Sequence, residues 1–199
     1  MILQPLLLVR LAAIFIGVAV FWILSNDNKK KTVESYLSLL TTWILFFIGA
    51  KLVTQWELLF DYPLSVLAYP SGTVEFYIAS VATILFEWRK REQHQSFIYS
   101  YIIMIASSLV GFALLARLVL EQGHATDLMF AFSFFLLVML WKRVEWSILL
   151  VAGGAVVSGF VFRAPSLMGY RMDFWFYLVF MMIGIVMVLL KKGGRNNGR

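Results

Sequence analysis

The sequence predicts an all-helical integral membrane protein with about seven transmembrane helices, its N-terminus outside the cell and its C-terminus in the cytoplasm. Three observations predict it. Hydrophobic residues make up 61% of the chain and charged residues only 14%, with a mean hydropathy of +0.84, a composition outside that of soluble domains. Long apolar stretches recur along the chain, and basic residues collect between alternate stretches.

Apolar stretches define the expected spans. Several are shorter than the roughly 20 residues that a straight transmembrane helix needs. A six-span arrangement is therefore the alternative, with 73–88 or 128–141 tilted or partly re-entrant. The stretches are 6–24, 36–53, 73–88, 97–120, 128–141, 144–162 and 174–190.

Basic residues indicate the orientation. Connections that contain Lys and Arg tend to stay in the cytoplasm. Most of the 17 basic residues fall in alternate connections and in the tail, which places the C-terminus inside: Lys29, Lys30, Lys31, Arg89, Lys90, Arg91, Lys142, Arg143, Lys191, Lys192, Arg195 and Arg199. The remaining ones lie in or beside the outer halves of spans: Arg10, Lys51, Arg117, Arg163 and Arg171.

The two ends of the chain and its composition limit other interpretations. No basic segment precedes the first apolar stretch and no small-residue cleavage site follows it, so we expect 6–24 to be a retained span rather than a signal peptide. Residues 1–190 are expected to form one membrane domain, and the Gly-rich, basic residues 191–199 a flexible cytoplasmic tail.

The chain has no Cys, which excludes disulfides and thiolate chemistry of its own. Because orientation accounts for the net charge of +6, nucleic-acid binding gains no support.

Ionisable groups near the outer ends of the spans are the candidates for function, because charges are costly inside a membrane. As cations that could hold an anionic lipid head group, we single out Lys51, Arg117, Arg163 and Arg171. As groups that could accept a proton, we single out His124, Glu75 and Glu121. The structural alternatives are a helix pair between Arg117 and Glu121, four residues apart, and simple snorkelling of Lys51 and Arg163 to the interface.

Motifs of familiar chemistries are missing from the sequence. It contains no HExxH, no GxxxxGK[ST], no GxSxG and no His/Asp/Glu cluster with metal-ligand spacing, so no metal and no cofactor are expected. Gly153, Gly154 and Gly159 predict close helix packing in the sixth span.

Short segments, taken in order over nearly the whole chain, resemble the prolipoprotein diacylglyceryl transferase family. Residues 47–51, which end in Gly49-Ala50-Lys51, resemble that family's Gly-Ala-Arg segment. Asp61-Tyr62-Pro63 resembles its Tyr/Asn-Pro stretch, and Tyr69-Pro70-Ser71-Gly72 stands where the family has a Gly-Gly element. Gly123-His124-Ala125-Thr126-Asp127 is similar to its His-Pro-Thr segment. Arg163 and Met168-Gly169 resemble a late arginine and the Met-Gly before the last span.

The resemblance implies a seven-span fold with its N-terminus outside, in the bacterial cytoplasmic membrane. It also implies an activity: transfer of a diacylglyceryl group from phosphatidylglycerol to the cysteine thiol of a lipoprotein precursor at the outer face. Such a reaction needs cations for the phosphate, a base for the thiol proton and an apolar chamber open to lipid.

Departures from the family concern this chemistry and leave alternatives open. The family's Gly-Arg-x-Gly-Asn-Phe motif is replaced by residues 111–116, Gly-Phe-Ala-Leu-Leu-Ala, and its His-Gly-Gly by residues 75–78, Glu-Phe-Tyr-Ile. Either the transferase uses rearranged groups, such as Arg117, Glu121 and Glu75, or the chain is a non-catalytic relative that binds anionic lipid or lipoprotein. A small-solute transporter is a third class, although no internal repeat supports it.

Overall fold

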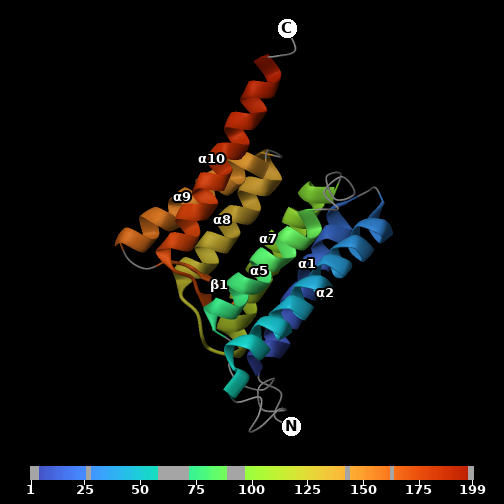
Figure 1. Ribbon diagram of the computed structural model, residues 1–199, viewed down its shortest axis with the longest axis vertical. Coiled ribbons are helices and arrows are strands. Elements are labelled where there is room, and N and C mark those ends of the chain that lie inside the picture. The colour runs from blue at the N-terminus through green and yellow to red at the C-terminus, as the bar shows by residue number, and fades with distance from the viewer. Residues whose placement is uncertain are drawn as a thin grey trace. The chain divides into compact units, whose positions relative to one another are not determined.

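Seven helices and one small hairpin form the part of the protein that the computed structural model describes, namely residues 5–25, 28–57, 72–88, 97–141, 144–161 and 164–196 (Figure 1). The helices are α1 (Pro5–Leu24), α2 (Lys29–Thr54), α5 (Thr73–Trp88), α7 (Ile98–Val119), α8 (Ala125–Trp141), α9 (Val144–Val161) and α10 (Phe174–Asn196). Three of them, α1, α2 and α7, are long and apolar enough to cross a membrane, and shorter apolar helices lie within α8, α9 and α10.

Helix bounds follow the apolar stretches closely, with two differences. Helix α5 begins and ends at the predicted residues. Helix α2 begins at Lys29, seven residues before the predicted span, and its 26 residues measure about 39 Å at 1.5 Å per residue. Lysine is a good helix former, so the helix continues beyond the length that an apolar core of about 30 Å requires. Helix α10 likewise continues to Asn196, beyond the predicted end at residue 190.

Large apolar side chains cover the outside of these helices. Ile23 is 80% exposed in the isolated chain, and Leu118, Leu140 and Phe160 are similarly open. A water-soluble protein rarely leaves apolar surface of this extent uncovered. Lipid acyl chains around the helices would cover this apolar surface and remove the cost of exposing it to water. The exposed surface therefore agrees with the membrane class that the composition predicts.

Contacts divide the chain into two compact units, Ser25–Tyr101 and the combination of Met1–Leu24 with Ile102–Arg199. In the first unit α2 packs on α5 through aromatic side chains. Trp43 stacks on Phe47 with ring centroids 5.1 Å apart and meets Phe76 edge-on at 5.5 Å. Its indole Nε1 donates a hydrogen bond of 3.1 Å to Ser80 Oγ, so the buried polar edge of the ring is satisfied.

In the second unit, glycines bring α1 close to α7. A side chain at Gly17 would overlap the Ser108 hydroxyl and the Met104 carbonyl, and a Cβ at Gly111 would lie 3.1 Å from Ile16 Cγ2. Small residues that allow two backbones to approach are a general device for packing helices in membranes. Glycine therefore has a packing role at both positions.

Helices α9 and α10 also pack closely, but not through the glycines that the sequence suggested. A Cβ at Gly184 of α10 would lie 3.2 Å from the Leu149 backbone of α9. At the Cβ positions of Gly153 and Gly154, by contrast, no atom of another element in the described part of the chain lies within 4 Å, and Gly159 has only ordinary contacts. The prediction of close packing at the Gly153-Gly154 pair is wrong, because the Cβ positions of these two glycines point to open space, although Ala152 and Ala155 beside them are buried.

A hairpin of two short strands, each of two residues, joins α9 to α10 in the second unit. Strand β1 (Ser166–Leu167) pairs antiparallel with β2 (Tyr170–Arg171), with Ser166 opposite Arg171. Met168 and Gly169 occupy the turn with φ of 49° and 82°. Two positive φ values in succession are typical of the tight turns that match the twist of paired strands, and glycine tolerates this conformation best.

Candidate functional site

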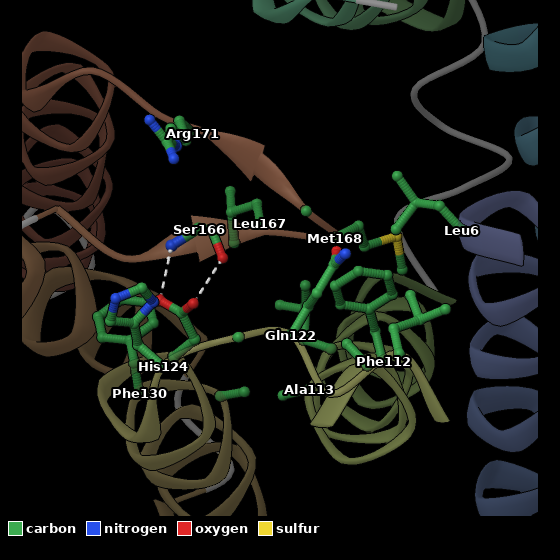
Figure 2. Close-up of a pocket in the computed structure, with 17 residues that line it drawn as sticks. Leu6, Phe112, Ala113, Gln122, His124, Phe130, Ser166, Leu167, Met168 and Arg171 are labelled. Carbon is green, nitrogen blue, oxygen red and sulfur yellow. Dashed lines mark hydrogen bonds between the residues drawn. The ribbon is translucent and has the colours of Figure 1, made fainter. Parts of the chain in front are cut away.

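A pocket of about 350 Å³ lies at one end of the second unit, where α1 begins, α7 ends, α8 begins and the hairpin folds back (Figure 2). Apolar walls come from Leu6, Phe112, Ala116 and Phe130, among others. The polar side chains at its lining are Gln122, His124, Asp127, Ser166 and Arg171. A concave, mostly apolar chamber with a few polar groups is the usual form of a small-molecule site.

Asp127 connects α8 to the hairpin. Its Oδ1 accepts a hydrogen bond of 2.9 Å from the Ser166 backbone N–H, and its Oδ2 accepts one of 2.7 Å from Ser166 Oγ, as the dashed lines in Figure 2 show. Bonds to a charged carboxylate are stronger than those between neutral groups. The carboxylate is therefore held against β1 and fixes the wall of the pocket that carries Ser166.

Arg10 connects α1 to the turn of the same hairpin. Its Nε donates to the Met168 carbonyl at 2.9 Å, its Nη1 donates to Tyr170 Oη at 2.9 Å, and its Cζ lies 4.1 Å from the centroid of the Tyr170 ring. The sequence identifies Arg10 only as one of the basic residues in or beside the outer halves of the spans. Its structural role depends on contacts between distant parts of the chain, and no local pattern signals it.

The end of α7 shapes the segment that carries His124. The helix ends at Val119, Glu121 has a φ of 51°, and the Gln122 N–H donates to the Ala116 carbonyl at 3.1 Å. The expectation that Arg117 and Glu121 lie on one helical face is therefore wrong, since Glu121 lies beyond the helix. The turn directs Gln122 and His124 toward the pocket instead (Figure 2).

The pocket brings together only some of the residues selected from the sequence. His124 and Arg171, one candidate base and one candidate cation, both belong to its lining. Arg117 and Glu121 are exposed and do not line it. Arg163 lies outside the described residues, as do Asp61 to Pro63, Tyr69 to Ser71 and the basic segments Arg89 to Arg91 and Lys142 to Arg143.

Lys51 and Glu75 form a separate polar cluster inside the first unit. Their side chains are only 4% and 5% exposed, and their opposite charges interact electrostatically. Glu75 Oε1 accepts a hydrogen bond of 2.8 Å from Thr54 Oγ1. Within the described part of the chain, Glu75 Oε2 and Gln55 Oε1 are buried without a hydrogen-bond partner. The cluster thus has unused acceptor capacity, which a water molecule or another donor would satisfy.

No group of three His, Cys, Asp or Glu side chains that could hold a metal occurs among the described residues. Comparison of the chain with protein families, with curated proteins and with solved structures finds no significant match.

Proposed function

We propose that this chain is a lipid-handling membrane protein that binds the head group of an anionic phospholipid, such as phosphatidylglycerol, in the pocket beside the hairpin. One observation carries the proposal: Arg171 and His124 line a chamber with otherwise mostly apolar walls, at the end of a bundle of apolar helices. A guanidinium binds a phosphate through two parallel hydrogen bonds, which favours Arg171 as the phosphate ligand.

Two further features favour an anion in this pocket. Helix α8 begins at Ala125, beside His124, and the N–H groups at a helix N-terminus attract negative charge. The Asp127 carboxylate, the acidic group in the lining, is already engaged by both donors of Ser166. Repulsion of a bound phosphate by Asp127 is reduced because these two donors compensate part of its charge.

The proposal includes the topology that the charge pattern predicts: seven spans in a bacterial cytoplasmic membrane, with the N-terminus outside. In the second unit the start of α1, the end of α7, the start of α8 and the α9–α10 connection all border the pocket. A chain that crosses the bilayer repeatedly brings alternate connections to the same face. With the orientation that the basic residues indicate, this face is the outer one.

Binding of labelled phosphatidylglycerol to the purified protein in detergent tests the head-group site. Arg171→Ala is expected to weaken binding by about tenfold, the equivalent of one charge-assisted contact of roughly 1.4 kcal/mol. Arg171→Lys should recover only part of the affinity, because lysine keeps the charge but loses the planar pair of donors.

Two control variants distinguish binding of the lipid in the pocket from nonspecific attraction of its head group to positive charges on the surface. Lys30→Ala removes an exposed cation at the start of α2, and Arg117→Ala removes an exposed cation at the end of α7 outside the lining. Both should leave affinity nearly unchanged. If all three alanine variants weaken binding equally, the head groups are attracted by surface charge and the pocket is not the site.

Diacylglyceryl transfer is the second candidate function, and the position of His124 in the same lining as Arg171 favours it. In that reaction the lipoprotein thiol gives its proton to His124. The thiolate attacks the glyceryl carbon, a carbon–sulfur bond forms, and the carbon–oxygen bond to the phosphate breaks. Glycerol phosphate then leaves with the bonding electrons. Arg171 would stabilise the charge on this leaving group.

Incubation of the protein with labelled phosphatidylglycerol and a lipobox peptide, beside an active family member as positive control, tests this reaction. The expected product is a thioether-linked peptide whose formation His124→Ala abolishes. Failure to form it under conditions in which lipid still binds would leave the chain a non-catalytic lipid-binding protein. Protein-dependent solute flux in liposomes would instead indicate a transporter.

A further inference from the structure

A second hollow lies beside the pocket and shares Phe130 with it. It is a groove of about 460 Å³ between α8 and α9, and its surface is mainly apolar. The side chains that form it are Thr126, Met129, Phe130, Ser133, Val157, Ser158, Val161 and Pro165, with Gly154 between them.

The groove and the pocket share one lining residue, and two further pairs of lining residues are adjacent in sequence. Phe130 lines both of them. Thr126 of the groove directly precedes Asp127 of the pocket, and Pro165 of the groove directly precedes Ser166 of the pocket. The pocket and the groove are therefore neighbours, and Phe130, labelled among the pocket residues in Figure 2, belongs to both linings.

The groove is suited to a flexible apolar chain. Met129, Val157 and Val161 leave most of their apolar surface open, and Gly154 has no atom of another element within 4 Å of a would-be Cβ. Among the described residues, the groove lining contains no charged side chain. A charged head group would lose its hydration at such a surface, whereas an acyl chain has no hydration to lose.

We propose that this groove holds one acyl chain of the lipid whose head group occupies the pocket, with the glycerol backbone passing over Phe130. The inference rests on the proposed function, and it specifies the ligand as a long-chain phospholipid rather than a water-soluble phosphate. One site then recognises both halves of an amphiphile: Arg171 and His124 contact the head group, and α8 with α9 contact the chain.

Two lipids and two neighbouring glycines test the inference. The probes are dioleoyl phosphatidylglycerol and dihexanoyl phosphatidylglycerol, which share a head group and differ in chain length. Gly154→Leu fills the groove and displaces part of the chain, and it should weaken binding of the dioleoyl lipid by about tenfold. Binding of the dihexanoyl lipid should stay within about twofold, since its short chains make little use of the groove.

Gly153→Leu is the matched control. Gly153 is the preceding residue of the same helix, is equally open at its Cβ position and does not line the groove, so this variant should bind both lipids normally. Thermal unfolding of each variant monitors folding. If Gly154→Leu is unstable, Val157→Phe provides the same test at an exposed groove position, with Leu150→Phe on the same helix as its control.

The outcomes separate this inference from the head-group proposal. Weaker binding of both lipids to Arg171→Ala, with dioleoyl binding intact in Gly154→Leu, overturns the acyl groove and leaves the head-group site standing. Normal binding of both lipids to Arg171→Ala overturns the head-group site and this inference with it. An equal loss for both lipids in Gly154→Leu, or an effect of Gly153→Leu as large as that of Gly154→Leu, also overturns the acyl groove.

Discussion

Arg10 and Tyr170, which are 160 positions apart in the sequence, contact each other in two ways: the guanidinium donates a hydrogen bond of 2.9 Å to the phenol oxygen, and its carbon lies 4.1 Å from the ring centroid. Arg10 Nε donates in addition to the Met168 carbonyl. This contact secures the hairpin from the side of α1, while Asp127 secures it from the side of α8.

Arg10→Ala should therefore destabilise the second unit. Hydrogen bonds to charged groups contribute about 1.5–3 kcal/mol and a cation–π contact about 0.5–2 kcal/mol, so we expect a clear fall in melting temperature in detergent. Tyr170→Phe keeps the ring and loses only the hydrogen bond, and it should cost less. In a double-mutant cycle the two changes should not be additive, and additivity would show that the hydrogen bond between Arg10 and Tyr170 contributes nothing.

Asp127→Ala should release the hairpin. The change removes the acceptor of two Ser166 bonds, so the Ser166 amide should exchange with solvent deuterium at least about tenfold faster, in line with a loss of some 1.4 kcal/mol. Glu121→Ala removes an exposed carboxylate in the preceding turn and is the control, with no expected change in the exchange of Ser166. Unchanged exchange in Asp127→Ala would mean that the strand pairing alone holds the hairpin.

Lys51→Met should destabilise the first unit, because it removes a positive charge that interacts with the buried Glu75 carboxylate. Loss of one partner of a buried charge pair costs about 3–5 kcal/mol. Adding Glu75→Gln should recover part of the stability, since neither charge then remains buried alone. Thr54→Ala, which removes one hydrogen bond to Glu75, should cost only about 1 kcal/mol. A double variant less stable than Lys51→Met would contradict this account.

Gly17→Ala and Gly49→Ala should have opposite effects, although both replace a glycine within an apolar helix. At Gly17 the added methyl would overlap Ser108 and Met104, whereas at Gly49 no atom of another element lies within 4 Å. The first change should cost about 1–3 kcal/mol through overpacking. The second should be neutral or stabilise by up to about 1 kcal/mol through helix propensity. Melting temperatures of the two variants provide the measurement, and equal shifts would contradict the close approach of α1 and α7.

Sequence alone determined the helical class and most helix bounds of this protein. An apolar stretch becomes a helix in lipid because every backbone polar group must be satisfied within the segment, so hydropathy predicted α5 and α9 to within a residue. It fell short at the C-terminal end, because α10 continues beyond its apolar part to Asn196. The sequence also identified His124 and Arg171 among the candidate functional residues, because ionisable groups are costly near the interior of a membrane.

Tertiary structure decided which of the candidate residues meet and which glycines pack. The pocket requires residues from the start of α1, the end of α7 and the hairpin, and the contacts of Arg10 span about 160 positions, so no local pattern encodes them. A glycine permits close packing only where its face of the helix meets a neighbour, which holds for Gly17 and Gly184 but not for Gly153 or Gly154. Hydropathy gives the length of a helix, but the rotation of each helix about its own axis depends on its partners.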